Sequence, residues 1–239
     1  MKKQSLINFG TELLSGRTDA EEILDAISEN IRLVGVDIQR EQALKEFDRQ
    51  KKILLKKGYP EAAGMSEDEF LVYINPLRKR IEELKSFGKN LAVLIVIPEG
   101  FVSISKKLSL LEWKGKGGQN YLDISRLRNA DGVEVPQVPY LLLDVEDGRE
   151  MRNVSPDNCV ERFKKVGRLG LTVNEGVMLV TYYPEILDDH FIDCLGSRFG
   201  SDSVPSICIS AAQVGLDFSD SSFSIERWGS ASCGSRIRA

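Results

Sequence analysis

Two copies of the tripeptide Gly-Ser-Arg, at residues 196–198 and 234–236, are the strongest candidates for a ligand site in this chain. Glycine lets a loop present successive backbone amides, serine adds a hydroxyl, and the guanidinium of arginine forms bidentate hydrogen bonds with phosphate or carboxylate. With Trp228 as an apolar wall, the two loops would make a pocket for a small anion. The predicted ligand-binding residues are Ser197, Arg198, Trp228, Ser232, Ser235 and Arg236. The alternative is that both arginines pair with structural carboxylates or cap carbonyl oxygens.

Acidic residues at the end of an apolar run offer a second kind of chemistry. Asp144 and Glu146 follow Tyr140-Leu-Leu-Leu and are two residues apart, so a strand would direct both side chains to one face. Two carboxyls with separated pKa values can act as general acid and base. This pattern suggests an enzyme, hydrolytic or transferase-like. The simpler interpretation is a turn at Asp147-Gly148.

A cysteine nucleophile is a third hypothesis. Cys233 precedes Gly-Ser-Arg in a loop whose amides and arginine would lower the pKa of its thiol. His190 is the only histidine and hence the only imidazole base. Spacing alone does not bring the two together, and a surface or capping role is the more common one for such a histidine.

A zinc site would need the same histidine with three cysteines. His190, Cys194, Cys208 and Cys233 are a known ligand set, but no two of them form a close pair such as CxxC. A hairpin of residues 191–195 and 204–210 would set Cys194 opposite Ile207, and Cys208 opposite Asp193. The two thiols would then point to opposite faces of the sheet. We therefore predict no metal site and no cofactor.

Composition narrows the range of partners and compartments. The 239 residues carry a net charge of −4 without a dominant basic stripe, which argues against a nucleic-acid partner. The longest apolar run, residues 91–97, is too short to cross a membrane, and the N-terminus is too polar for a secretory signal. Four irregularly spaced cysteines do not resemble a disulfide framework. We expect a cytoplasmic protein with free thiols, possible homo-oligomers and a small anionic ligand.

The first 88 residues have the pattern of packed helices. A capping box at Thr18–Glu21 opens a helix that Gly35 is expected to end, and a second helix covers residues 40–57. Another capping box at Ser66–Glu69 opens a third helix, which Pro76 should kink or split. The second helix carries a basic cluster that would be either a partner-binding face or a solvated face: Lys45, Arg49, Lys51, Lys52, Lys56 and Lys57.

Strand patterns begin after residue 88. Expected strands cover residues 91–97, 139–146, 191–195, 204–210 and 214–218. Helices are expected from Pro156 to Val166 and after a capping box at Thr172–Glu175. The glycine-rich segment 114–118 lacks a phosphate-binding pattern and is expected to be a mobile surface loop. The predicted fold class is α+β, with an N-terminal helical segment (1–88) and a mixed β-sheet lobe (89–239), or one continuous domain.

Several separated motifs resemble a bacterial family known as domain of unknown function 5701. They are FDRQKKILLKKGYPEAAGMSEDEF, VPYLLLDVEDGREMRNVSP, LTVNEGVMLVTYYPEIL, CLGSR with VPSICIS, and RWGSASCGSR. The resemblance spans roughly residues 46–236. It implies a bacterial protein but no established activity, and it supplies no catalytic residues. In relatives, the positions of Cys194 and Cys233 need not be cysteine.

Overall fold

A single long helix organises the N-terminal part of the chain. The computed structural model describes residues 20–201 and 203–239, and for residues 20–23 it describes the backbone alone. Helix α2 (Ala20–Lys56) continues through Gly35, so the predicted break there is wrong. A glycine inside a helix costs only about 1 kcal/mol, and the packing of the second half of α2 offsets it. The predicted cap at Thr18 lies outside the described residues.

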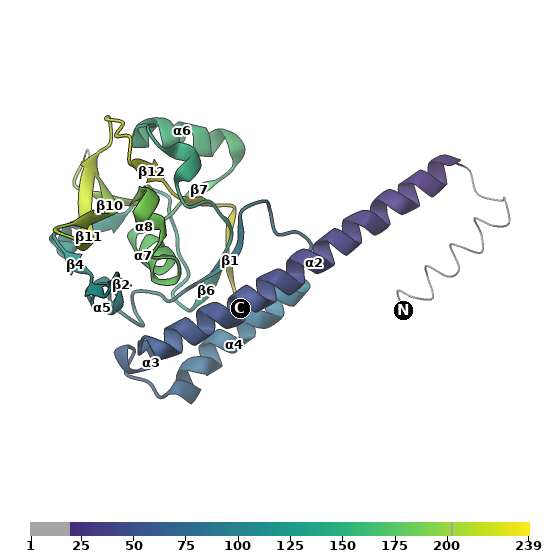
Figure 1. Ribbon diagram of the computed structural model, residues 1–239, viewed down its shortest axis with the longest axis horizontal. Coiled ribbons are helices and arrows are strands. Elements are labelled where there is room, and N and C mark those ends of the chain that lie inside the picture. The colour runs from purple at the N-terminus through teal and green to yellow at the C-terminus, as the bar shows by residue number, and fades with distance from the viewer. Residues whose placement is uncertain (1–19, 202) are drawn as a thin grey trace.

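Two further helices follow α2 in the described part of the N-terminal segment. The short helix α3 (Tyr59–Ala62) follows Gly58, and α4 (Glu67–Glu83) begins at the predicted capping box of Ser66 and Glu69. Helix α4 does not split at Pro76. The carbonyl that loses its donor belongs to Val72, a residue that is 68% exposed, where water replaces the missing bond. Helices α2 and α4 lie side by side along one side of the body (Figure 1).

A three-stranded antiparallel sheet lies against α2. Its order is β1 (Leu91–Val96), β6 (Tyr140–Val145) and β14 (Ser235–Arg238). Within residues 20–201 and 203–239, no strand lies beside the outer edge of β1, and the buried side chain of Gln50 in α2 takes that place. Its amide nitrogen donates to the Val93 carbonyl at 2.9 Å, and the Ile95 amide donates to its oxygen at 2.8 Å. The helix thus satisfies backbone groups that a neighbouring strand would otherwise pair.

A five-stranded mixed sheet forms the far side of the lobe. Its order is β12 (Trp228–Ser230), β8 (Phe191–Asp193), β10 (Ser203–Ser210), β11 (Gln213–Asp220) and β4 (Gln119–Asn120). The register sets Ser206 opposite Asp193, two residues away from the predicted pairing of Cys208 with Asp193. The reason is that residues 197–199 form another strand, so β8 and β10 are not joined by a simple turn.

Three two-stranded ribbons connect the larger elements. They pair β2 (Glu112–Trp113) with β3 (Lys116–Gly117), β5 (Leu127–Asn129) with β9 (Ser197–Phe199), and β7 (Leu169–Gly170) with β13 (Ser232–Cys233). The first ribbon replaces the expected loop over 114–118. Its two turn residues, Lys114 and Gly115, have φ of 49° and 77°, as a tight hairpin turn requires.

Four helices and two 3-10 turns pack with the strands in the described residues of the lobe. The helices are α5 (Ile104–Leu110), α6 (Pro156–Val166), α7 (Val173–Tyr182) and α8 (Ile186–Asp189), and the turns are η1 (Ile124–Arg126) and η2 (Arg149–Met151). The expected limits of α6 and the Thr172–Glu175 capping box of α7 are confirmed. Helix α7 contacts both larger sheets. A Cβ at its Gly176 would lie 2.7 Å from the Cys194 sulfur, so glycine permits this close packing.

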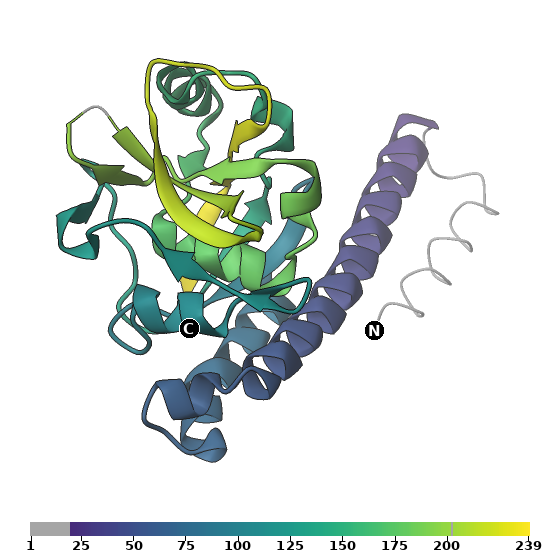
Figure 2. The same ribbon diagram turned by 60° about the vertical axis from the view of Figure 1, so that its left-hand side comes forward.

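The described chain is an α+β protein, as predicted. One hydrophobic cluster extends from Phe47 and Leu54 in α2, through β1 and β6, to Ile207 in β10. The helical segment and the sheet lobe therefore share core residues. Figures 1 and 2 show the first half of α2 projecting beyond this body, while the C-terminus ends on the three-stranded sheet. None of the helices in the described part of the chain is long and apolar enough to span a membrane.

Candidate functional site

The two Gly-Ser-Arg units line one cavity, which we call the arginine cavity. Arg198 belongs to β9, and Ser235 and Arg236 belong to β14. The cavity has a volume of about 800 Å³, within the range of small-molecule sites. Its charged lining residues are Arg128, Asp131, Glu134, Lys164, Arg168, Arg198 and Arg236. Residues of both units thus lie at the wall of one cavity.

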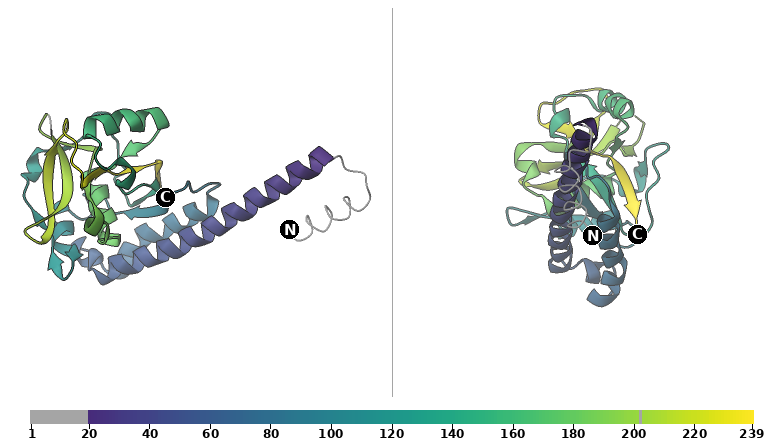
Figure 3. Two further views of the ribbon diagram at one scale, coloured as in Figure 1. Left: turned by 45° about the horizontal axis from the view of Figure 1, so that its top comes forward. Right: turned by 90° about the vertical axis from the view of Figure 1, so that its right-hand side faces the viewer.

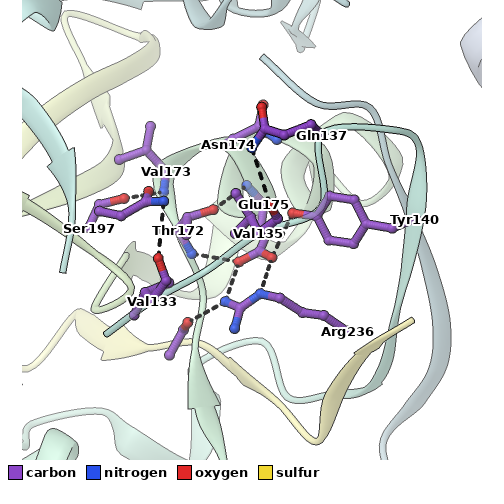
Figure 4. A network of polar contacts seen from close by, with 12 residues as sticks. Val133, Val135, Gln137, Tyr140, Thr172, Val173, Asn174, Glu175, Ser197 and Arg236 are labelled. Atoms are coloured by element: carbon purple, nitrogen blue, oxygen red, sulfur yellow. Dashed lines mark hydrogen bonds and ion pairs between the residues drawn. The ribbon is translucent and has the colours of Figure 1, made fainter. Parts of the chain in front are cut away.

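Arg236 is already paired with a buried carboxylate. Its Nε and Nη2 atoms donate to the two oxygens of Glu175 at 2.6 and 2.8 Å. Glu175 is fully buried and also accepts from the Tyr140 hydroxyl at 2.8 Å and the Thr172 amide at 2.7 Å (Figure 4). Burial alone would lower the pKa of Arg236, but the bonds and charge of Glu175 raise it above its usual value. Arg236 is therefore the counter-ion of Glu175.

Arg198 has a different environment. Its Nη1 donates to the carbonyl oxygens of Leu195 and Ser197, both at 2.8 Å. Among the described residues no carboxylate forms an ion pair with it. Arg128 lies directly opposite Arg198 in the β5–β9 ribbon, so two guanidinium groups share one face of the ribbon. Arg128 also pairs with the exposed carboxylate of Asp131 at 2.9 Å. Like charges at opposed positions disfavour the ribbon unless an anion lies between them.

The glycine of the first unit is explained by chain crossing. A Cβ at Gly196 would lie 2.6 Å from the carbonyl oxygen of Gly170, and a Cβ at Gly170 would lie 2.8 Å from the Leu195 Cβ. The two backbones cross at this point, and the Gly196 amide donates to the Leu171 carbonyl at 2.8 Å. Gly196 thus holds Arg198 at the rim of the cavity through packing of the backbone.

The serines of the predicted set have separate roles. The hydroxyl of Ser197 accepts from the Val173 amide at 3.0 Å, at the start of α7. Ser197 lines a second, smaller cavity of about 280 Å³ on its side of the β5–β9 ribbon. Ser232 accepts a hydrogen bond from Arg168 Nε at 2.8 Å. Of the predicted serines, Ser235 lines the arginine cavity with Arg198 and Arg236, and Ser201 lines it as well.

Asp144 is bound on both carboxylate oxygens. One accepts from the amides of Lys89 and Asn90 and from the Asn90 side chain, and the other accepts from Arg168 at 2.7 Å. Desolvation would raise the pKa of Asp144, but the bonds from Asn90 and Arg168 keep it below its usual value. With φ of 52°, Asp144 also leaves the regular strand geometry on which the predicted pairing with Glu146 depended. These contacts give the Asp144 carboxylate a structural role.

Glu146 lies in a different environment from Asp144. Only 6% of the residue is exposed, and burial raises the pKa of its carboxyl. Its Oε1 accepts from the Glu150 amide at 3.0 Å, whereas its buried Oε2 has no hydrogen-bond partner in the described chain. Glu146 lines a cavity of about 420 Å³ together with Asp147, Glu150 and Tyr183. Among the described residues, the Glu146 carboxyl combines burial, a raised pKa and a position at the wall of a cavity, which are the properties of a general acid.

The remaining predicted residues lie apart from the arginine cavity. Burial raises the pKa of the Cys233 thiol to about 12, which makes it a poor nucleophile. His190 is buried, with Nε2 3.0 Å from the Asp147 carbonyl oxygen and Nδ1 3.2 Å from Asp189. Trp228 packs edge-to-face on Phe191 with ring centroids 4.7 Å apart. Across the described ranges, no group of three His, Cys, Asp or Glu side chains could hold a metal ion.

Two buried titratable residues were missed from the sequence. Lys107 in α5 is fully buried and donates to the Ile97 carbonyl at 2.7 Å and to Asn174, and desolvation lowers its pKa to about 7. Asp193 in β8 is 1% exposed, and desolvation raises its pKa to about 7. Asp193 interrupts an apolar strand pattern, which was the available signal. Lys107 gave none, because its helix had not been predicted.

The fold and these cavities define an α+β protein with several internal polar sites and no recognisable catalytic motif. The chain belongs to the family of unknown function DUF5701, whose sequence profile matches residues 53–223. The family resemblance inferred from the motifs is thereby confirmed over most of the chain. Comparison with curated proteins gave no match, and neither did comparison with solved structures.

Proposed function

We propose that this protein binds a small anionic ligand in the arginine cavity, with Arg198 and Arg128 as the residues that contact it. The observation that carries this proposal is the opposition of two arginines across the β5–β9 ribbon, at the wall of a cavity of about 800 Å³. A phosphate or carboxylate between the guanidinium groups would relieve their repulsion and accept charge-assisted hydrogen bonds from both.

The two Gly-Ser-Arg units have different hydrogen-bond partners, and both sets of contacts support a rigid site. Arg236 anchors β14 to α7 through Glu175, and Arg198 is oriented by two carbonyl oxygens. A binding group that is held before the ligand arrives loses less conformational entropy on binding. In this proposal Arg198 of the first unit contacts the ligand, while Arg236 of the second unit fixes β14 in the cavity wall.

Isothermal titration with inorganic phosphate tests the proposal. Arg198→Ala should weaken binding by about 10- to 100-fold, the effect of one charged hydrogen-bond pair, and leave thermal unfolding nearly unchanged. Lys165→Ala is the matched control, since it removes an exposed charge from α6 next to the lining residue Lys164. Equal weakening in both variants would show unspecific attraction and contradict the proposal. Native mass spectra would reveal any ligand that the purified protein retains.

We propose a cytoplasmic location in a bacterium for this activity. The four cysteines are buried free thiols, as in proteins of reducing compartments. Fractionation of cells that produce the protein, with detection by antibody, tests the compartment directly.

A second proposed function is an enzyme that uses Glu146 as general acid. The supporting observation is a buried carboxyl at the wall of a cavity, with a raised pKa and one oxygen that has no hydrogen-bond partner among the described residues. Residues kept for chemistry often reduce stability, so Glu146→Gln should stabilise the fold near neutral pH. A destabilised Glu146→Gln variant would assign the carboxylate a structural role instead.

A further inference from the structure

Five apolar side chains of α2 remain exposed on one side of the helix. Their exposed fractions lie between 42% and 68%, and they form what we call the α2 seam: Leu24, Ile27, Ile31, Val34 and Ile38. The seam is part of the half of α2 that projects from the body, as the left panel of Figure 3 shows. It also precedes residue 53, where the match to the family begins.

The spacing along the seam is three, four, three and four residues. This repeat averages 3.5 residues and is the pattern by which helices wind around one another. We propose that the α2 seam pairs with the α2 seam of a second copy of this chain, in an antiparallel arrangement.

The residues beside the seam fit a helical partner. Its flanks carry Ser28, Asn30 and Gly35, together with Asp37, whose carboxylate pairs with Arg40 at 2.5 Å. Glu29 and Arg32 fall on the opposite face, where they pair with each other at 2.6 Å. A second helix can therefore approach the seam without burying these charges.

Side-chain shape and charge select the antiparallel orientation. Ile27 and Val34 occupy the d positions of the heptad, where parallel two-stranded coils favour leucine. Residues 20–29 contain four acidic and no basic residues, whereas residues 30–40 contain two arginines and one aspartate. A parallel pair would set acidic segment beside acidic segment. An antiparallel pair centred near residue 29 sets each acidic segment beside the more basic segment of its partner. The attraction acts at long range, because Glu29 and Arg32 themselves lie on the face away from the contact.

Analytical ultracentrifugation over a wide range of protein concentration tests the association. The seam spans about two heptads, so we expect a monomer–dimer equilibrium that depends on concentration. Ile31→Lys should abolish the dimer, because it puts a charge at the centre of the seam. Val72→Lys is the matched control, since Val72 on α4 has the same 68% exposure as Ile31. A wild-type monomer at all concentrations, or a dimer that survives Ile31→Lys, would overturn the proposal.

Disulfide trapping tests the orientation and the identity of the partner. When Ile27→Cys and Ile31→Cys proteins are mixed and oxidised, an antiparallel pair gives the mixed disulfide. A parallel pair gives only like-with-like disulfides, which would overturn the orientation. The four natural cysteines are buried and should not interfere. If the full chain is monomeric but associates after deletion of residues 1–19, that segment covers the seam, and the proposal is wrong.

Discussion

Glu175 combines two structural roles in one side chain. It completes the capping box of α7 and serves as the buried partner of Arg236. Four hydrogen bonds, two of them from the guanidinium, compensate for its loss of hydration. The N-terminus of α7, strand β6 and strand β14 are thereby joined at one carboxylate.

Arg236→Ala is predicted to lower the free energy of unfolding by about 3–5 kcal/mol, because the Glu175 carboxylate remains buried without its counter-ion. Urea denaturation measures the loss. Arg238→Ala, two residues further along β14 and exposed, should change stability by less than about 0.5 kcal/mol. Adding Glu175→Gln to the Arg236→Ala variant should recover part of the lost stability. If the two single changes lowered the free energy of unfolding additively in the double variant, that result would contradict the pairing.

Asp193 should make stability depend on pH. Its pKa is raised from 3.8 to about 7 in the folded protein, so folding favours the protonated form. The stability associated with Asp193 is complete below about pH 4 and is lost as the pH rises through 7. A shift of this size corresponds to at most about 4 kcal/mol. Wild type should therefore weaken relative to Asp193→Asn between pH 4 and 8 in urea titrations. A constant difference between the two proteins would refute the prediction.

At the scale of elements, the turn between β10 and β11 is strained. Ala211 and Ala212 adopt φ of 48° and 60°, the left-handed region that glycine and asparagine tolerate better. Ala211→Asn with Ala212→Gly should raise the free energy of unfolding by roughly 1 kcal/mol. Ala63→Gly, at an ordinary φ of −85°, should bring no gain. Thermal unfolding of the three proteins compares them, and equal effects of both changes would argue against strain in the turn.

Elements with local signals were predictable from sequence. The limits of α6 and the capping boxes of α4 and α7 depend on neighbouring residues, and these were correct. The continuity of α2 through Gly35 and the β5–β9 ribbon depend on partners far along the chain. Strand β9 lies in the first Gly-Ser-Arg segment, which we expected to be a loop, and it forms because Leu127–Asn129 lies beside it. Such pairings leave little trace in a short window of sequence.

The dependence on partners far along the chain also limited the prediction of the candidate site. The repeated Gly-Ser-Arg pattern drew attention to two segments, in β9 and β14, that line one cavity. The pattern could not distinguish the two arginines, because the partner of Arg236 is 61 residues away. Nor could it reveal that Arg128 faces Arg198, since that pairing depends on the unpredicted ribbon.

On the scale of the whole molecule, the body and the projecting part of α2 contribute differently to folding. The described core residues of α2 begin at Ala43, and the seam lies before them. A chain that begins at Gly35 should therefore have a free energy of unfolding within about 1 kcal/mol of that of the full protein. It should lose self-association. Calorimetry and ultracentrifugation of the same samples check both statements. A large drop in melting temperature would show that the projecting half supports the body.

Gln50 has a consequence for the solubility of the molecule. Strand β1, with the sequence LAVLIV, is apolar along its whole length, and the amide of Gln50 occupies groups on its open edge. Apolar strands with free edges template the addition of further chains and lead to amyloid-like fibrils. When α2 detaches, that edge becomes available to every neighbouring molecule that has opened in the same way. We therefore expect resistance to fibril growth to depend on helix packing over this edge, because the Tyr182 hydroxyl of α7 also donates to the Ile95 carbonyl, at 3.0 Å.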